Sequence, residues 1–189
     1  GGPWSCTRLG YRHLLTSLAS LQSRPAPRAD PRFGVVPAHQ ELPSEVKMNH
    51  VPIPESHRDL LDGNACVALT TVMPGGQPQI TPVWCNRDEE GYVLLNIMRG
   101  FRKEKNMRTN PKVTVLAYDT KNPLRSIEIR GTVIEMTEEG ALEHLNQLTQ
   151  LYMHKSDARF FGDSVPAELK ATHVPVKIKI APMCVRVEG

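Results

Sequence analysis

From Met48 onward the chain alternates short apolar runs with turn residues, a pattern that predicts a sheet of short strands. Residues 65–72 are rich in β-branched and apolar side chains, and the following Pro74-Gly75-Gly76 predicts a turn. Similar runs recur to the end of the chain. The predicted strands span residues 65–72, 79–86, 92–98, 113–118, 126–136, 174–180 and 184–187. Because few helices lie between them, they predict a mainly β, antiparallel barrel rather than a parallel sheet.

Helical signals interrupt these strands in three places. A short helix is predicted at 53–61, a second at 101–109 and a third at 137–153, where leucines recur about one turn apart. Thr137 is expected to cap the third helix. Residues 154–172 show no clear period, so we expect a loop with weak helical character there.

The first 47 residues differ from the rest of the chain. Residues 1–29 contain arginine and serine but no Asp or Glu, and residues 24–43 are rich in proline without a period. An acid-poor, arginine-bearing start is typical of a transit peptide. The alternative, which we favour, is a non-native leader, because Met48 directly precedes the regular pattern. On either interpretation we expect residues 1–47 to be a disordered extension and residues 48–189 to form one folded domain.

Composition narrows the function classes. The 189 residues are 40% hydrophobic and 23% charged, with a net charge of +3, which is an ordinary globular balance. Aromatic residues are only 5% and do not interleave with the basic ones, so we expect no nucleic-acid partner. No run approaches the roughly 18–20 apolar residues of a membrane helix. We therefore expect no membrane span and a cytoplasmic protein.

Cysteine and histidine spacing argues against a metal site. The four cysteines are far apart and form no C-x-x-C pair, so neither a zinc site nor a disulfide framework is expected. Cys66 and Cys85 lie in apolar runs and are expected to be buried free thiols. The seven histidines show no metal-ligand spacing.

A basic turn between a strand and a helix is the leading candidate site. Gly100 separates the strand ending at Met98 from the predicted helix, and a glycine lets a backbone approach an anion closely. The helix start offers free N–H groups, to which basic side chains add charge. A plain solvated basic helix would show the same residues, so both interpretations stay open. The basic residues are Arg99, Arg102, Lys103, Lys105 and Arg108.

Two further segments could serve the same site. Arg125-Ser126, at the start of a strand, could contact an anion, or Arg125 could be an ordinary turn residue. Gln79 and Thr81 could bond the polar edge of a ring, with Trp84 packed either on that ring or in the core. Neither a paired acid and base nor a phosphate-binding glycine motif nor a nucleophile elbow is present. A redox cofactor would explain this, because it carries the chemistry itself.

Three segments together resemble the pyridoxamine-phosphate-oxidase-like split β-barrel superfamily, and especially its deazaflavin-dependent branch. They are Ile53-Pro54-Glu55-Ser56-His57-Arg58-Asp59-Leu60-Leu61 with Gln77-Pro78-Gln79-Ile80-Thr81-Pro82-Val83-Trp84, then Leu94-Leu95-Asn96 through Arg99-Gly100 to Asn110-Pro111, and finally Asn122-Pro123-Leu124-Arg125 with Glu128-Ile129-Arg130-Gly131. The resemblance implies a six-stranded antiparallel split β-barrel of the FMN-binding type. It also implies a homodimer with the cofactor at the interface, either coenzyme F420 (a deazaflavin) or FMN.

The resemblance also assigns cofactor contacts to particular positions of this chain. The phosphate would meet Arg99, Arg102, Lys103 and Asn106; the ring would face Gln79 and Thr81; Asn96 and Ile97 would line the groove; and Arg125 and Ser126 would contact the tail. Two positions depart from the family pattern. Phe101 stands where many relatives have a basic residue, and Thr172-His173 stands where they often have an arginine.

The implied function is an oxidoreductase, a deazaflavin-dependent reductase that transfers a hydride to an unsaturated small-molecule substrate. The first alternative is an FMN-binding oxidase or flavin reductase, and the second is a non-catalytic flavin or haem binder. No catalytic residue is assigned. His57, His144, His154 and His173 are candidates for a proton donor only in principle.

Overall fold

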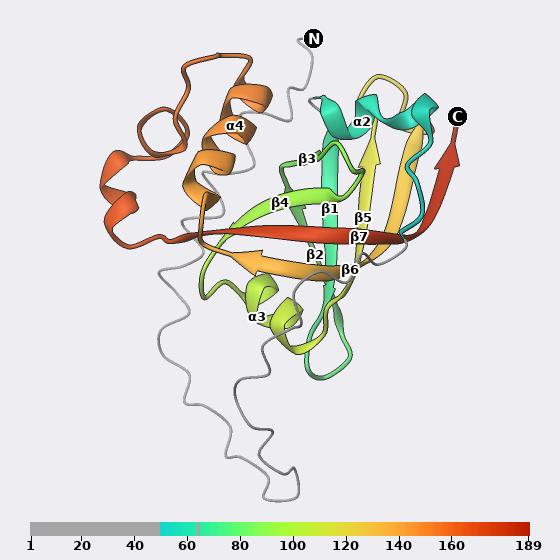
Figure 1. The fold of residues 1–189 in the computed structure, drawn as a ribbon, viewed down its shortest axis with the longest axis horizontal. Helices are drawn as coiled ribbons and strands as arrows, with labels where there is room; N and C mark the ends of the chain where they lie inside the picture. Colours follow the sequence, from blue (N-terminus) through green and yellow to red (C-terminus); the bar gives the residue numbers. More distant parts are fainter. Residues whose placement is uncertain (1–49, 64) are drawn as a thin grey trace, which may run out of the picture.

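The computed structural model describes residues 50–63 and 65–189, which form a curled antiparallel sheet with a few helices around it (Figure 1). The predictions for residues 1–47 lie outside the described residues. The sheet has seven strands in the order β2-β1-β5-β6-β7-β4-β3. They are β1 (Cys66–Val72), β2 (Pro78–Val83), β3 (Cys85–Arg87), β4 (Val93–Met98), β5 (Lys112–Tyr118), β6 (Ser126–Thr137) and β7 (Pro175–Glu188). The mainly β, split-barrel prediction is confirmed.

The two strands at the ends of this order are consecutive parts of one segment. β2 pairs with β1 and β3 pairs with β4, and only Trp84 separates them. The sheet therefore curls round until both of its edges meet the segment 78–87. The sequence predicted one strand over 79–86, and the structure divides it where the chain passes from one neighbour to the other. Counted as one strand, β2 and β3 give the predicted six.

The last strand corrects a prediction. The sequence predicted two closing strands, but β7 is continuous over fourteen residues and is the long red strand of Figure 1. It pairs with β6 along its length and with β4 over its first half. The apparent break at Pro182 is a register shift opposite Gly131, where a Cβ on residue 131 would lie 2.8 Å from the Ala181 carbonyl oxygen. Glycine allows the two strands to approach this closely.

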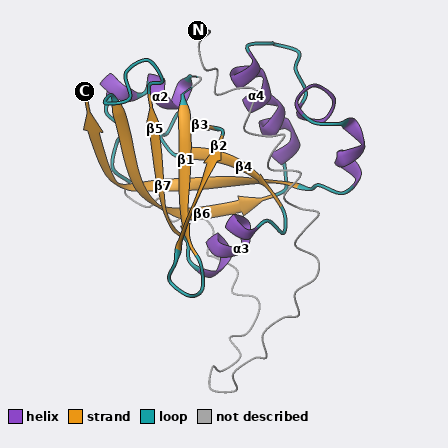
Figure 2. Cartoon of the chain, turned by 180° about the vertical axis from the view of Figure 1, so that it is seen from behind, coloured by secondary structure: helices purple, strands orange, loops and turns teal. Residues whose placement is uncertain are grey.

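The helices lie at the ends of the barrel and beside it. They are the short 3-10 turn at Glu55–His57, α2 (Asp59–Asp62), α3 (Arg102–Thr109), α4 (Ala141–Met153), and two irregular turns at Phe160–Ser164 and Ala167–Ala171. Thr137 does not cap α4, because β6 continues through it and its hydroxyl accepts a bond from the Glu139 N–H at 3.1 Å. Figure 2 shows α4 and the segment after it beside the barrel, with α3 below the sheet.

Two apolar clusters hold these parts together. The larger fills the barrel with side chains from all seven strands, including Leu69, Val115 and Ile178, none of which is exposed. The smaller joins the barrel to α4 and the segment after it, through Met98 and Phe160 among others. Each cluster removes apolar surface from water and so fixes the position of its elements.

The junction of β2 and β3 is held by Tyr152 of α4. Its hydroxyl accepts a bond from the Cys85 N–H at 3.1 Å and donates one to the Cys85 carbonyl at 3.2 Å. Burial raises the pKa of Tyr152, and it raises that of the Cys85 thiol to about 12. Cys85 is a buried free thiol, as predicted, whereas Cys66 is disulfide-bonded, so the prediction of a free thiol there is wrong.

Candidate functional site

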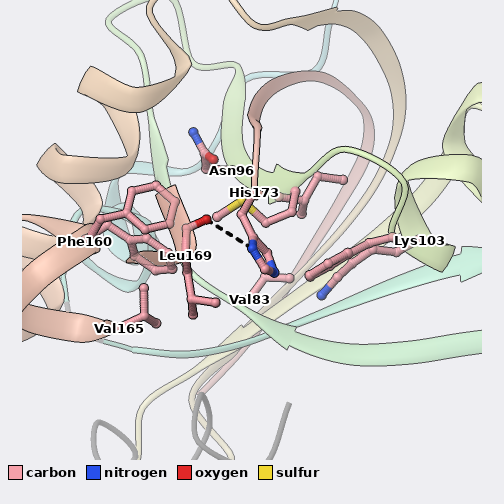
Figure 3. A pocket seen from close by; sticks show the side chains of 11 residues that line it. Val83, Asn96, Lys103, Phe160, Val165, Leu169 and His173 are labelled. Atoms are coloured by element: carbon pink, nitrogen blue, oxygen red, sulfur yellow. Dashed lines mark hydrogen bonds between the residues drawn. The ribbon is translucent and has the colours of Figure 1, made fainter. Parts of the chain in front are cut away.

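A hollow lies between the barrel and the segment 160–173, and its wall is mainly apolar (Figure 3). It measures about 570 Å³, counting the space that opens to solvent. Ligand pockets in proteins typically carry a small number of polar groups on an apolar wall. Three polar side chains line this hollow, one from each of three elements: Asn96 from β4, Lys103 from α3, and His173 just before β7.

Lys103 brings a buried positive charge to the hollow. Its side chain is buried, and its Nζ donates a hydrogen bond to Thr81 Oγ1 at 3.1 Å. Within 50–63 and 65–189, no carboxylate forms an ion pair with it. Burial therefore lowers the pKa of Lys103 from 10.5 to about 8, so the ammonium is still charged at pH 7. A buried charge without a counter-charge is costly and is unusual outside functional sites.

A second buried polar residue of α3, Asn106, ties the helix to the sheet. Asn106 is almost fully buried, and its Nδ2 donates to Thr71 Oγ1 at 3.0 Å and to Gln79 Oε1 at 3.1 Å. Four predicted cofactor contacts therefore meet: Gln79 and Thr81 of β2 with Lys103 and Asn106 of α3. These bonds fix α3 against β1 and β2 and so hold the Lys103 side chain in place.

The turn before α3 has the geometry that its glycine predicted. Gly100 has a φ of +83°, in the left-handed region that glycine adopts without strain. Its N–H is bonded to Glu104 Oε2 at 3.1 Å, and Glu104 also pairs with Arg108. α3 itself has no side-chain cap at its N-terminus. Its first turn thus retains N–H groups that can receive an anion.

Asn96 presents an acceptor that has no partner among the described residues. Its Nδ2 donates to the Ala141 carbonyl at 2.7 Å, and its Oδ1 is buried without a hydrogen bond. The His144 Nδ1 lies 3.3 Å from the same Nδ2, and the His144 Nε2 lies 2.9 Å from Asn86 Oδ1. Burial, followed by the charge of Lys177, lowers the pKa of His144 to about 4, so the ring is neutral and donates through Nε2. The amide orientation of Asn96 is therefore fixed, and Oδ1 is left for a ligand donor.

His173 lies on the wall of the hollow, in the loop just before β7. Its Nδ1 lies 3.1 Å from the Leu169 carbonyl and 2.9 Å from Thr172 Oγ1. Its ring meets Phe101 edge-on, with centroids 6.3 Å apart. In Figure 3 the bonded nitrogen faces Leu169 and the other nitrogen turns toward the Val83 and Lys103 side of the hollow.

The structure does not gather all of the predicted contacts here. Ile97 lines the hollow, but Arg99 is exposed and pairs with Glu138, while Arg102 is exposed. Arg125 pairs with Asp59 of α2 and donates to the Ser56 carbonyl at 2.7 Å. It lies with Ser126 at the α2 end of the sheet, whereas α3 lies at the other end (Figure 1). Their contact with a cofactor stays a prediction, and it would need a second subunit.

Sequence reasoning missed the wall that the segment 160–173 contributes. Phe160, Phe161, Val165 and Leu169 line the hollow from irregular turns, for which no period exists in the sequence. It also missed Glu104, whose role was obscured by the basic residues around it. The one available signal was the density of aromatic and apolar residues in an otherwise irregular stretch.

Comparison with protein families decides the family of this barrel. The family model described as pyridoxamine 5'-phosphate oxidase matches residues 53–176. The chain belongs to this family. The match covers α2, the sheet from β1 to the start of β7, and all three polar residues of the hollow.

Solved structures with this family's fold include an F420 reductase, with 25% identity and a TM-score of 0.59 over 71% of this chain and 98% of that one. A conserved hypothetical protein from Mycobacterium tuberculosis has 20% identity and a TM-score of 0.54, over 77% of this chain and 89% of that one. HupZ from Group A Streptococcus has 21% identity and a TM-score of 0.52, over 71% and 93%. No curated protein matches the chain. The second and third likenesses concern the fold alone.

Two negative findings apply to the described part of the chain. It contains no cluster of three or more His, Cys, Asp or Glu side chains suited to a metal ion. None of its helices has the length and apolar character needed to cross a membrane.

Proposed function

We propose that the protein is an oxidoreductase that binds coenzyme F420 and transfers a hydride to an unsaturated small-molecule substrate. The observation that carries the proposal is the Lys103 ammonium, which is buried beside an apolar hollow and, within the described part of the chain, bonds to Thr81 and forms no ion pair. A phosphate at this point would supply the missing negative charge. The likeness to an F420 reductase supports the choice of a deazaflavin.

The surrounding groups fit a phosphate better than a neutral ligand. The Asn106 bonds to β1 and β2 hold α3 in place, so the Lys103 charge and the free N–H groups of the first turn converge from one rigid element. Charge-assisted hydrogen bonds from such groups are about twice as strong as neutral ones. Arg102 is exposed on the same turn and can approach from solvent.

The hollow suits the ring system and the substrate. Its apolar wall excludes water, and the Asn96 Oδ1 offers an acceptor to a ring N–H or O–H. When bound, a reduced deazaflavin supplies the hydride. The side chains of this protein would bind, orient and desolvate the reactants, which lowers the barrier by holding them in a reactive geometry.

The first alternative cofactor is FMN, which also presents a phosphate and a ring. Lys103 would bind the phosphate of FMN in the same way, and the family match supports FMN as the cofactor. The second alternative is a non-catalytic flavin or haem binder, for which His173 is the side chain in the hollow able to ligate iron.

We also propose a homodimer, because the outer face of β2, β1 and β5 carries an apolar strip. Ile80 is 67% exposed and Leu116 39% exposed. Ala68 pairs with both Pro82 and Leu116, and Thr70 pairs with Ile80, which puts these side chains on one face. Ile80→Lys is expected to shift the mass in solution from dimer to monomer by light scattering; a wild-type chain that is already monomeric would contradict the proposal.

Titration of the purified chain with F420 and with FMN, followed by fluorescence, tests the function. We expect a dissociation constant well below about 100 µM for one of them. Lys103→Ala is expected to weaken that binding by tenfold or more, about 1.4 kcal/mol, because a charge-assisted bond to the phosphate is lost.

Lys105→Ala is the matched control, since Lys105 lies on the same helix but is exposed. It removes the same charge from the chain but leaves the Lys103 ammonium beside the hollow. Equal cofactor binding by the two variants would mean that only the net charge matters and would refute the binding of the phosphate by Lys103. Failure of the wild type to bind either cofactor would refute the enzyme proposal.

A further inference from the structure

We propose that His173 is the proton-transfer residue of the hollow, acting on a flat substrate with a carbon–carbon double bond conjugated to a carbonyl. The inference rests on the proposed function and deepens it. His173 lies on the wall of the hollow, and the ring nitrogen that is not bonded to Leu169 turns toward Lys103 (Figure 3).

The hydrogen bonds of His173 fix its tautomer. The Leu169 carbonyl can only accept, so the His173 Nδ1, at 3.1 Å, carries the hydrogen. Thr172 Oγ1 donates to that same carbonyl at 3.3 Å and is left to accept from Nδ1 at 2.9 Å. The neutral ring therefore has its lone pair on Nε2. A backbone carbonyl that orients the ring in this way is the usual means of setting which nitrogen reacts.

The walls around Nε2 define the substrate class. Phe101 meets the His173 ring edge-on at 90°, and Phe160 and Phe161 meet each other at 87° with centroids 5.1 Å apart. With Val165 and Leu169 they leave apolar and aromatic surfaces against which a flat molecule can pack. A saturated or strongly charged substrate would gain little from such walls, whereas a conjugated carbonyl compound is flat and largely apolar.

The proposed step balances in atoms and charge. A reduced cofactor bound in the hollow would supply a hydride, with its electron pair, to the carbon of the double bond farther from the carbonyl. The Nε2–H of protonated His173 would give a proton to the other carbon, so the double bond would become a single bond. The cofactor would be left oxidised and His173 neutral. Water then returns a proton to Nε2, because the side chain is only half-buried.

Few other titratable groups face His173. Lys103 is the other titratable side chain on the wall of the hollow. Arg99 is near through its backbone, whose N–H bonds to the Val174 carbonyl at 2.8 Å, but its guanidinium pairs with Glu138. The turn Ala167–Ala171 brings Lys170 and Glu168 into the neighbourhood, and the Glu168 side chain is exposed.

Two measurements on the full chain test the proposal, with His173→Gln as the variant. The first is the long-range ¹H–¹⁵N NMR spectrum of the histidines in the ligand-free protein, in which the variant identifies the His173 signals by their loss. We expect a neutral ring protonated at Nδ1. A ring protonated mainly at Nε2 would overturn the proposal.

The second measurement is the anaerobic single-turnover oxidation of the bound reduced cofactor by a panel of cyclic enones. We expect His173→Gln to slow it by about 100- to 10,000-fold, the usual contribution of general acid catalysis, with the cofactor dissociation constant unchanged. His154→Asn, at an exposed position with a positive φ that asparagine tolerates, is the control and should behave like wild type.

The remaining outcomes each decide the matter. If His173→Gln oxidises the bound cofactor at the wild-type rate, this inference is overturned. It is also overturned if the wild-type protein reacts with every enone no faster than the free reduced cofactor does. In both cases, normal cofactor binding would leave the proposed function standing. Failure of the wild type to bind either cofactor would instead refute the proposed function. A haem Soret band that is present in wild type and lost in His173→Gln would make His173 an iron ligand and overturn its role in proton transfer.

Discussion

Replacing Lys103 by methionine should stabilise the ligand-free protein while abolishing its binding of a phosphate-bearing cofactor. Burial lowers the pKa of Lys103 from 10.5 to about 8, which corresponds to about 3 kcal/mol of penalty for holding the charged form in the fold. Methionine keeps an apolar stem of similar length and removes the charge. The hydrogen bond to Thr81 is lost, at about 1 kcal/mol. We expect a net gain of about 1–2 kcal/mol in the free energy of unfolding at pH 7.

The dependence on pH distinguishes a desolvated charge from other causes. Because the folded pKa lies below the unfolded one, the penalty is fully present below about pH 8. Between pH 8 and 10.5 the unfolded chain holds more protons than the folded one, so wild-type stability rises with pH. The advantage of Lys103→Met should therefore shrink over this range. Urea denaturation at pH 7, 9 and 10.5 measures it.

Lys105→Met serves as the control, because Lys105 is exposed on the same helix and its loss should change stability by less than about 0.5 kcal/mol. A Lys103→Met protein that is less stable than wild type at pH 7, or whose difference from wild type is the same at all three pH values, would refute the reasoning. The buried ammonium would then be a stabilising group of the fold and no sign of a ligand site.

Three further results are expected. Affinity for the phosphate-bearing cofactor, measured by fluorescence titration, should fall above about pH 8 as Lys103 loses its proton. An affinity that does not change up to pH 10 would contradict the binding of the phosphate by Lys103. Gly131→Ala should lower the free energy of unfolding by about 1–3 kcal/mol, because its Cβ would come within 2.8 Å of a β7 carbonyl oxygen, whereas Gly75→Ala has open space and should not. Tyr152→Phe should lose about 1–3 kcal/mol in urea denaturation, since both backbone groups of Cys85 lose their partner; unchanged stability would mean that water replaces it.

The parts of the fold that the sequence predicted are those with a local cause. Each strand was marked by apolar runs between turn residues, and α3 by its glycine turn at one end and Asn110-Pro111 at the other. The errors came from partners distant in the chain. β7 continues through Pro182 because β6 shifts register opposite it, and β6 continues through Thr137 because β7 still pairs with it there. A single sequence shows neither pairing.

The candidate site divides in the same way. Gln79, Thr81, Lys103 and Asn106 were predicted through the family resemblance, and they meet because β2 and α3 are adjacent. Spacing along α3 could have separated Lys103 from Arg102, since only one of them can face the sheet. The wall that the segment 160–173 contributes to the hollow could not be predicted, because this segment is placed by packing on α4 and the barrel rather than by its own periodicity.

The two departures from the family pattern turn out to be one feature of the structure. Phe101 replaces a basic residue after the glycine, and His173 lies where relatives often have an arginine, 72 residues later in the chain. Their rings meet edge-on, 6.3 Å apart, on the wall of the same hollow. Two cations at this distance would repel each other unless an anion lay between them. A phenyl ring beside an imidazole needs no such anion, and together they turn that wall from one suited to a charged group into one suited to a flat apolar molecule. Among the described side chains that line the hollow, the positive charge then rests with Lys103, so we assign the cofactor phosphate to Lys103 and the substrate to the apolar wall.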